Sequence, residues 1–529
     1  MGYLLHHAVD EWAERTPEVE AFRFEDSALT YEDLRRRTDA LAATLKRLGI
    51  RPSDRVGIYM NKSLDLPVAI YGILKAGGVY VPIDPNSPIS RVDSIIGDCG
   101  IRVLITGDSR AKRVCELSQS TGLTAVIGSE RPVESPATDG AEWIAWDKIE
   151  LAGEPPPTVP LTENDLAYLM YTSGSTGSPK GLMHTHRSGL AYVILSAEVY
   201  EVGPGCRLGN HSPLHFDMST FEYLTGPNLG ATTVIIPEEV TMFPASLGEL
   251  IEQEGLTHWY SVPLALIQLV DRGCLEECHG STLRWVLFGG EPFPPKYLRQ
   301  LMDRWPRATF SNSYGPAEVN QCTFYHLPPG TVVSDEPVPL GQIWPGAEGM
   351  VVDGRGKEVE PGEVGEFLVR APTMMQGYWG QPKLSEEAIL TLETFPGYRK
   401  QYYRTGDLVS LRPDGLLTFR GRKDRQVKVR GYRVELDEIE AVCNAVESVI
   451  EAAALPLRDD EGSVEIIAVA QFREGAEADT TTLRRELFSF LPPYAVPSTV
   501  HVRTGFPRTG SGKIDRRALI DEYQAGRNP

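Results

Sequence analysis

Apolar and polar residues follow a helical spacing near the start of the chain. Between Tyr31 and Leu48 apolar side chains return every three or four positions, the period of an amphipathic helix. Thr30, with Asp33 three residues later, is typical of a capped helix start, and Gly49 is typical of a helix end. The pattern predicts a helix over residues 31–48.

Short runs of β-branched and aromatic residues follow at intervals along the first part of the chain. Helix-length segments separate these runs, which is the pattern of an α/β protein. We therefore expect layered sheets with helices on their faces. The runs are residues 54–60, 80–83, 102–106, 124–127, 232–236 and 285–288. Residues 130–160, rich in Pro, Glu and Ala, indicate an irregular surface connection.

The pattern of predicted strands and helices changes twice in the second half of the chain. After Pro337, strand-like runs such as 349–353 and 366–369 alternate with Gly and Pro turns, which predicts a small β-rich subdomain. From Asp424 onward a compact α+β unit of about a hundred residues is expected, a usual domain size. Its predicted elements are strands 426–430, 450–454 and 465–470 and helices 436–446 and 482–490. The fold class is therefore α/β, with a large N-terminal domain (1–423) and a small α+β C-terminal domain (424–529).

The composition limits the classes of protein that fit. A chain of 529 residues with 41% hydrophobic residues is longer than one hydrophobic core usually supports, so two or more domains are expected. The formal net charge of −20 argues against nucleic-acid binding, because a phosphate backbone needs a basic surface. We see neither a membrane span of roughly 20 apolar residues nor a signal peptide, so no membrane association is expected. Seven cysteines in no regular frame indicate reduced thiols and favour a cytoplasmic protein.

The strongest chemical signal is the segment Tyr171–Gly181, which reads YTSGSTGSPKG and follows an apolar run at residues 166–170. Small residues let backbone N–H groups converge on an anion, while hydroxyl groups and the Lys180 ammonium add donors. The spacing is not that of a Walker loop, because Gly174 and Gly177 are three apart and no Gly-Lys-Ser/Thr follows. A flexible Ser/Gly linker is the alternative, but a linker is not expected to begin directly from an apolar strand. We therefore expect a phosphate site.

This segment resembles the phosphate-binding signature of the adenylate-forming superfamily, which includes acyl-CoA synthetases, luciferases and the adenylation domains of nonribosomal peptide synthetases. Further segments resemble the family's motifs, and they occur in the family's order over almost the whole chain. These segments are residues 29–34, 74–84, 312–318, 403–407, 421–428, 430–435 and 507–515. The resemblance implies the adenylate-forming enzyme fold, with ATP and Mg²⁺ as cofactors.

The resemblance also implies which residues bind the nucleotide. Tyr314 is expected to stack on adenine, Asp407 to bind the ribose hydroxyl groups, and Glu318 to hold Mg²⁺. Lys513 is expected to stabilise charge on the α-phosphate, so Lys513, Lys180 and Glu318 are the expected catalytic residues. The implied nucleotide contacts are Thr172, Ser173, Gly174, Ser175, Thr176, Gly177, Lys180, Gly289, Gly290, Glu291, Asn312, Ser313, Tyr314, Gly315, Ala317, Asp407, Arg422 and Lys513.

A mobile C-terminal domain is also implied by the resemblance. In the family this domain rotates after adenylation, and Asp424 resembles the hinge residue. Rotation would withdraw Lys513 and bring residues 430–433 to the active site for attack by a thiol. We therefore expect a gated cycle of two steps.

The nature of the acid depends on a single charged residue. An amino acid differs from a fatty acid by its ammonium group, so its pocket needs a carboxylate in an otherwise apolar wall. Asp217 resembles the aspartate that binds the substrate amino group in amino-acid-activating members; the alternative is a structural aspartate that caps a nearby helix. The other implied wall positions carry no charge, which favours a neutral substrate of modest size. They are Met218, Phe221, Ser261, Leu287, Gly289, Ser313, Gln321 and Cys322.

Two departures from the usual family pattern bear on function. Ala317 stands where most members have Thr, so a hydroxyl contact to phosphate or metal is lost or replaced by water. The chain ends at Pro529, soon after Lys513, so we expect a free-standing enzyme whose acceptor is the phosphopantetheine thiol of a separate carrier protein. Residues 259–267 and 288–292, together with Ala317, are similar to free-standing enzymes that load β-amino acids onto carrier proteins in macrolactam polyketide pathways.

Three alternatives stay open at this point. An α-amino acid is one, because moving the amino group by one carbon changes its distance to Asp217 by only about 1.5 Å. A second is an acyl-CoA synthetase in which Asp217 is structural. The third is a catalytically silent nucleotide-binding or scaffold protein, against which the presence of Lys180, Glu318, Asp407 and Lys513 argues.

Overall fold

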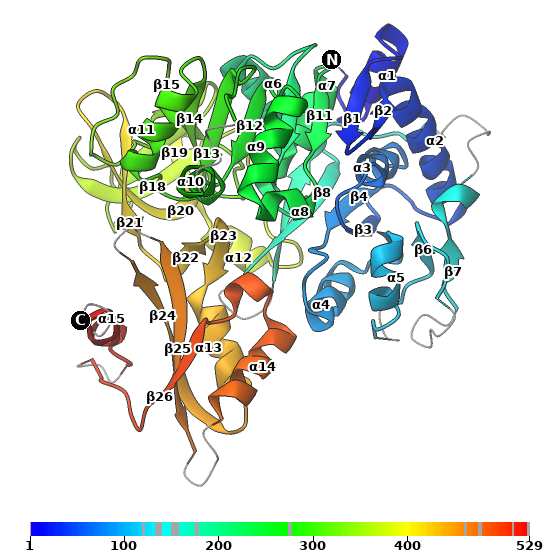
Figure 1. Ribbon diagram of the computed structural model, residues 1–529. Coiled ribbons are helices and arrows are strands. Elements are labelled where there is room, and N and C mark those ends of the chain that lie inside the picture. Colours follow the sequence, from blue (N-terminus) through cyan, green and yellow to red (C-terminus); the bar gives the residue numbers. More distant parts are fainter. Residues whose placement is uncertain are drawn as a thin grey trace. The chain divides into compact units, whose positions relative to one another are not determined.

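The computed structural model describes residues 2–118, 122–132, 140–149, 158–174, 179–272, 278–459, 463–473, 479–509 and 513–525 (Figure 1). The chain divides into two compact units. The first unit consists of Met1–Pro85, Ile96–Tyr171 and Gly181–Lys423, and the second of Asn86–Ile95, Thr172–Lys180 and Asp424–Pro529.

A seven-stranded sheet in the first unit has its described strands in the order β7-β6-β5-β3-β4-β8-β9, and the strands from β7 to β8 pair in parallel. The strands at its centre are buried along almost their whole length, as expected for a parallel sheet covered on both faces. The strands are β3 (Arg55–Tyr59), β4 (Val79–Pro82), β5 (Val103–Thr106), β6 (Ala125–Ile127), β7 (Glu142–Ile144), β8 (Leu166–Thr172) and β9 (Lys180–Thr185).

A nine-stranded sheet in the same unit has the order β16-β15-β14-β13-β12-β10-β11-β1-β2. It is parallel from β14 to β1 and antiparallel at both edges. The carboxyl ends of its parallel strands therefore lie at one edge, which is where ligands bind in open α/β sheets. The strands are β1 (Glu20–Phe24), β2 (Ser27–Thr30), β10 (Arg207–Asn210), β11 (Thr232–Ile235), β12 (His258–Ser261), β13 (Trp285–Gly289), β14 (Thr309–Tyr314), β15 (Thr323–Leu327) and β16 (Gln342–Ile343).

Helices cover these sheets, and their apolar faces form the main cores of the first unit. They are α1 (His7–Arg15), α2 (Tyr31–Arg47), α3 (Asp65–Lys75), α4 (Ile89–Cys99, shared with the second unit), α5 (Asp108–Val114), α6 (His186–Tyr200), α7 (Gly226–Asn228), α8 (Glu238–Met242), α9 (Pro244–Gln253), α10 (Pro263–Asp271) and α11 (Pro295–Arg304), with the short helical turns Trp146–Lys148, Asp217–Ser219 and Phe221–Thr225. A further helix, α12 (Pro382–Glu387), packs against β19 instead.

The β-rich part of the first unit is a five-stranded antiparallel sheet in the order β17-β18-β20-β19, with β21 paired to β20. It confirms the β-rich subdomain predicted after Pro337. The strands are β17 (Glu348–Val352), β18 (Val364–Arg370), β19 (Ile389–Phe395), β20 (Tyr398–Leu411) and β21 (Leu417–Arg422).

The second unit is built around the sheet β24-β25-β26, with a separate hairpin β22-β23. Successive residues of β24 face opposite sides of the sheet: Ala452 and Ala454 join the core under α13 and α14, whereas Ala453 and Leu455 join the core that contains Leu519 of α15. Helices thus cover both faces of this sheet. The elements are β22 (Gln426–Val429), β23 (Tyr432–Glu435), α13 (Leu436–Ala445), β24 (Val449–Arg458), β25 (Val464–Phe472), α14 (Thr480–Phe490), a helical turn Pro493–Ala495, β26 (Thr499–Val502) and α15 (Arg516–Ala525).

The predicted elements agree with the structure except in one interval. The helix expected over 31–48 is α2, and the side chain of Thr30 accepts the hydrogen bond from the Asp33 N–H that defines its cap. The expected runs of β-branched and aromatic residues all form strands. The expectation of an irregular connection over 130–160 was wrong in part, because Glu142–Ile144 pair in parallel with β6; residues 133–139 and 150–157 lie outside the described residues. No described helix is long and apolar enough to cross a membrane.

Candidate active site

A carboxylate held by two neighbours lies in the first unit where β14 approaches the five-stranded sheet. Asp407 of β20 pairs in register with Arg422 of β21, and Arg422 Nη1 donates to Asp407 Oδ1 at 2.5 Å. The hydroxyl of Tyr314, at the end of β14, donates to Asp407 Oδ2 at 2.5 Å. Each carboxylate oxygen retains a lone pair, so Asp407 can still accept hydrogen bonds from a diol such as ribose. The structure thus brings together three of the predicted nucleotide contacts.

The glycines of the candidate site are required by the close approach of neighbouring backbone. Gly289 pairs with Ser313, and a Cβ at Gly289 would lie 2.2 Å from the Ser313 carbonyl oxygen. A Cβ at Gly315 would lie 2.1 Å from the Asn320 carbonyl oxygen, and Gly290 has a φ of +91°. Neighbouring backbone therefore leaves no room for a Cβ at Gly289 or Gly315, and the left-handed conformation at Gly290 favours glycine there. That they also admit a base stays a prediction.

Glu318 is fully buried in the first unit, and its Oε1 accepts a hydrogen bond of 2.9 Å from the hydroxyl of Tyr378. Beside it, His184 Nε2 lies 3.2 Å from the carbonyl oxygen of Ala317. Burial lowers the pKa of His184 to about 4, so the ring is neutral and donates this bond through Nε2–H. Tyr378 was not predicted as a site residue.

The donor set near Glu318 fits magnesium that is bound mainly through a nucleotide. In the part of the chain that the structure describes, no three His, Cys, Asp or Glu side chains gather as a cation cage. Mg²⁺ usually takes only one or two carboxylates, with substrate phosphates and water as its other ligands. A single oriented carboxylate such as Glu318 is therefore sufficient on the protein side.

Asp217 begins the helical turn Asp217–Ser219 in the first unit, and its Oδ1 accepts a 3.0 Å hydrogen bond from the N–H of Met218. Phe216 occupies the cap position of this turn and no side-chain hydrogen bond caps it, so the contact is not the helix cap of the structural alternative. The carboxylate also acts on buried tyrosines: burial first, and then the negative charge of Asp217, raise the pKa of Tyr168 of β8. The same charge contributes to the raised pKa values of Tyr192 and Tyr260. The charge of Asp217 therefore acts on side chains from both large sheets.

Three of the other predicted wall positions belong to one hydrophobic cluster, and Cys322 belongs to another. Met218, Phe221 and Leu287 share a hydrophobic cluster with six further aromatic residues, namely Tyr192, Tyr200, Tyr260, Trp285, Phe324 and Trp344. Phe221, Ser261, Leu287 and Cys322 have no exposed surface. All the other predicted wall positions are buried, so we expect room for only a small substrate side chain.

Tyr200, at the end of α6, links two of the wall positions and was missed by sequence reasoning. Its hydroxyl lies 2.9 Å from Ser313 Oγ and accepts a hydrogen bond from Gln321 Nε2. The other amide atom, Gln321 Oε1, is buried without a hydrogen-bond partner among the described residues. No local pattern indicates Tyr200, because its partners are more than a hundred positions away along the chain.

Of the predicted phosphate loop, the described residues between Tyr171 and Gly181 belong to the second unit, whereas Tyr171 and Gly181 belong to the first. The hydroxyl of Thr172 is buried without a partner in the described chain, and Ser173 Oγ donates to the Arg433 carbonyl at 2.9 Å. Lys180 Nζ lies 3.9 Å from Glu435 Oε1, and burial raises the pKa of Glu435 against the opposing charges of Arg433 and Lys180. The unpartnered Thr172 hydroxyl fits the prediction of an anion site. Ser175, Thr176 and Gly177 lie outside the described residues.

Lys513 and Asp424 both lie in the second unit. Lys513 is exposed, and its carbonyl accepts a 2.8 Å hydrogen bond from the Thr509 N–H. Asp424 is the first residue of the longest stretch of this unit, and its Oδ1 accepts a bond from the Gln426 N–H. Their roles as catalytic lysine and hinge stay predictions.

The remaining predicted contacts have the following surroundings. Asn312 Nδ2 donates to the Pro339 carbonyl at 2.7 Å, and Glu291, beyond the end of β13, is half-buried. Gly174 is buried in the second unit.

Comparison with known proteins identifies the class of enzyme that this fold and these residues define. Residues 9–379 match the AMP-binding enzyme family, and residues 438–513 match the AMP-binding enzyme C-terminal domain. The chain therefore belongs to the AMP-binding enzyme family, as the sequence motifs predicted.

Two relatives that match over most of their length are named as amino acid ligases. The chain is 36% identical over 527 residues to an L-proline–[L-prolyl-carrier protein] ligase of Pseudomonas fluorescens, covering 98% of this chain and 99% of that protein. It is 37% identical over 497 residues to the ligase of the same name in Streptomyces coelicolor, covering 93% and 91%. The predicted class of enzyme is thereby confirmed.

A solved structure confirms the predicted adenylate-forming fold. The Vibrio cholerae adenylation domain AlmE, in complex with glycyl-adenosine-5'-phosphate, has a TM-score of 0.85 to this chain. The match covers 99% of this chain and 98% of that chain at 22% identity, so it is a likeness of fold.

Proposed function

We propose that the chain is a free-standing enzyme that activates an amino acid with ATP, forming aminoacyl-AMP and pyrophosphate, and transfers the acyl group to the phosphopantetheine thiol of a separate carrier protein. The observation that carries this proposal is the position of Asp217. Its negative charge acts on Tyr192 and Tyr260, which are buried with Met218 in a mainly apolar cluster. A substrate ammonium is the group that such a carboxylate binds best. The relatives named as amino acid–carrier protein ligases support the same activity.

In the first half-reaction a carboxylate oxygen of the amino acid attacks the α-phosphorus of ATP. The bond from that phosphorus to the β-phosphate oxygen breaks, and pyrophosphate leaves with the electron pair. We assign Lys180 and the Thr172 hydroxyl to the departing phosphates, and Lys513 to the charge that develops on the α-phosphoryl oxygens. Asp407 would hold the ribose and Tyr314 the adenine. Mg²⁺ on Glu318 would neutralise charge on the phosphate oxygens.

In the second half-reaction a thiolate attacks the acyl carbon, and the bond from that carbon to the AMP oxygen breaks. We assign residues 1–423 to the binding of ATP and amino acid, and residues 424–529 to a mobile domain that moves about Asp424. Withdrawal of Lys513 between the two steps would then make room for the thiol, so one site could serve both reactions.

The substrate that we favour is a small, neutral amino acid. The wall positions carry no charge, and four of them have no exposed surface. A β-amino group is suggested by the resemblance of residues 259–267 and 288–292 to enzymes of macrolactam polyketide pathways. The relatives named for L-proline make an α-amino acid the direct competitor.

Amino-acid-dependent exchange of pyrophosphate into ATP tests the proposal. The panel is glycine, β-alanine, 3-aminobutanoate, L-proline and L-leucine, with butanoate as the analogue that lacks an amino group. We expect exchange with at least one amino acid and at most background with butanoate, and a higher kcat/KM for 3-aminobutanoate than for L-proline. Exchange with butanoate equal to that with the amino acids would support an acyl-CoA synthetase instead. Exchange with none of these acids would support a catalytically silent nucleotide-binding protein. Product analysis with a phosphopantetheinylated carrier or with coenzyme A then identifies the acceptor thiol.

A further inference from the structure

A buried lysine outside the predicted site joins the two large sheets of the first unit. Lys62 follows β3 of the seven-stranded sheet, and its side chain is only 8% exposed. Its ammonium donates to the carbonyl oxygens of Asn210 at 2.9 Å, His211 at 2.7 Å and Ile236 at 3.2 Å. These three acceptors use all three ammonium hydrogens.

The carbonyls that Lys62 binds lie where two parallel strands of the nine-stranded sheet end. Asn210 is the last residue of β10, and Ile236 follows the last residue of β11. β10 and β11 are neighbours in the sheet. Lys62 therefore fixes the point at which the chain leaves β10, at the edge where the candidate site lies.

The segment that starts at this point ends at Asp217. The side chain of Asn210 donates to the Ser212 carbonyl at 3.0 Å, near the segment's start. At its end, Ser219 Oγ lies 2.6 Å from the Phe216 carbonyl and 3.1 Å from the Leu214 carbonyl. The backbone of residues 210–217 is thus held at both ends by polar side chains, and Asp217 follows directly from it.

Carboxylates surround the lysine without forming a direct ion pair with it in the described chain. Glu222 Oε2 accepts from Asn210 Nδ2 at 3.3 Å, and Glu238 Oε2 accepts from Asn61 Nδ2 at 2.5 Å. Burial lowers the pKa of the Lys62 ammonium to about 7, and the charges of the two carboxylates oppose this shift. Donation to three carbonyls needs three hydrogens on Nζ, so these contacts are those of the ammonium form.

We propose that Lys62 is a positioning residue for amino acid binding: its ammonium sets the path of residues 210–217 and thereby the place of the Asp217 carboxylate. This inference rests on the proposed function, in which Asp217 binds the substrate ammonium. Lys62 contacts backbone carbonyls and has no part in the chemistry. Its loss should therefore weaken amino acid binding and leave ATP binding unchanged.

The test is pyrophosphate exchange with the best-exchanged amino acid of the panel, measuring KM separately for amino acid and for ATP. In Lys62→Met the KM of the amino acid is expected to rise about ten-fold, which corresponds to the loss of roughly one well-made hydrogen-bonded contact. The KM of ATP should stay within about two-fold of wild type. Lys62→Arg, which keeps charge and donors, should recover most of the loss. Ser219→Ala removes the hydrogen bonds at the other end of the segment, so it should also raise the KM of the amino acid and leave that of ATP unchanged. This variant replaces Lys62→Met in the test if Lys62→Met does not fold.

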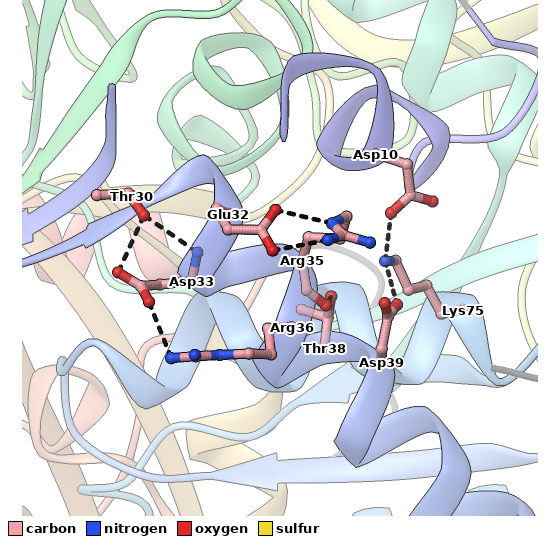
Figure 2. Close-up of polar contacts among 9 residues, drawn as sticks. All are labelled: Asp10, Thr30, Glu32, Asp33, Arg35, Arg36, Thr38, Asp39 and Lys75. Carbon is pink, nitrogen blue, oxygen red and sulfur yellow. Dashed lines mark hydrogen bonds and ion pairs between the residues drawn. The ribbon is translucent and has the colours of Figure 1, made fainter. Parts of the chain in front are cut away.

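Lys75→Met is the matched control, because Lys75 is equally buried in the same unit but pairs with Asp10 and Asp39 (Figure 2). It should change neither KM.

Asp217→Ala and the double variant Asp217→Ala/Lys62→Met complete the set, and the double variant should have the amino acid KM of Asp217→Ala alone. If Asp217→Ala leaves that KM unchanged, the proposed function fails and this inference with it. Only the positioning role of Lys62 is overturned if Asp217→Ala raises the amino acid KM while Lys62→Met and Ser219→Ala do not. The same holds if the amino acid KM of the double variant rises by the product of the two single effects.

Discussion

Two tyrosines each orient a carboxylate of the candidate site by a hydroxyl hydrogen bond. Tyr314 donates to Asp407, and Tyr378 donates to Glu318. Such bonds to a charged acceptor are stronger than neutral ones and fix the direction of the remaining lone pairs. The binding geometry of these carboxylates therefore depends on residues that are not themselves ionised.

Tyr378→Phe should impair the use of magnesium. The change removes one donor from the buried Glu318, so this carboxylate loses its fixed orientation. We expect the Mg²⁺ concentration for half-maximal pyrophosphate exchange to rise about five-fold, equivalent to about 1 kcal/mol, a typical net hydrogen bond. Tyr402→Phe is the control, since Tyr402 donates to Glu348, a partly exposed carboxylate outside the site. Equal Mg²⁺ dependence in both variants would contradict the role of Tyr378.

For single residues of the candidate site, the sequence indicates the charged ones better than the neutral residues that hydrogen-bond to them. Asp217, Asp407 and Glu318 stand in motifs whose chemistry is evident from the residue types. Tyr378 lies 60 positions from Glu318, and Tyr200 lies 113 positions from Ser313. Such partners are set by how strands and helices pack, which no local pattern encodes. Lys62 was missed for the same reason, because its acceptors are backbone carbonyls more than a hundred positions away.

Among the helices, α2 shows how local and distant contacts combine (Figure 2). Its start is set locally, because Thr30 caps it and Glu32 pairs with Arg35 one turn away. Its place in the unit depends on Lys75 of α3, whose ammonium lies 2.6 Å from Asp10 of α1 and 2.5 Å from Asp39 of α2. One buried cation thus joins three helices.

Lys75→Met should destabilise the protein without affecting substrate binding. The substitution leaves Asp10 and Asp39 without their cation, although both carboxylates keep some access to water. We expect the free energy of unfolding to fall by about 2–3 kcal/mol, somewhat below the cost for a fully buried pair. Urea unfolding followed by circular dichroism measures this. Lys148→Met, which removes an exposed pair with Asp147, should change stability by about 0–1 kcal/mol; an equal loss in both variants would contradict the account of Lys75.

Prediction of elements succeeded where their signals are local. The helix start at Thr30 and the alternation of strand and helix after Asp424 are set by neighbouring residues. The strand Glu142–Ile144 was missed because it is short and stands among Pro, Glu and Ala residues. It is a strand because its backbone pairs with β6, and that partner is invisible in the local sequence.

The molecule as a whole consists of two units. The longest stretch of the second unit begins where the sequence changes from a β-rich pattern to an alternation of strands and helices. Asp424 marks that point. The second unit also takes in residues 86–95 and 172–180, which local patterns place with the sheets of the first domain. Contacts such as that of Arg91 with Glu438, 2.8 Å between Nη1 and Oε1 and almost fully buried, account for their membership. The segment that carries Lys180 therefore belongs by its contacts to the same unit as Lys513.

The central claim is that this enzyme of the AMP-binding family selects an amino acid through the charge of Asp217. The most direct measurement compares kcat/KM in pyrophosphate exchange for the best amino acid and for its analogue without the amino group, in wild type and in Asp217→Ala. Loss of a desolvated charge-assisted contact corresponds to roughly a hundred-fold, so we predict a preference of at least that size in wild type, falling to nearly one in the variant. The same preference in both proteins would show that Asp217 is structural and would contradict the account.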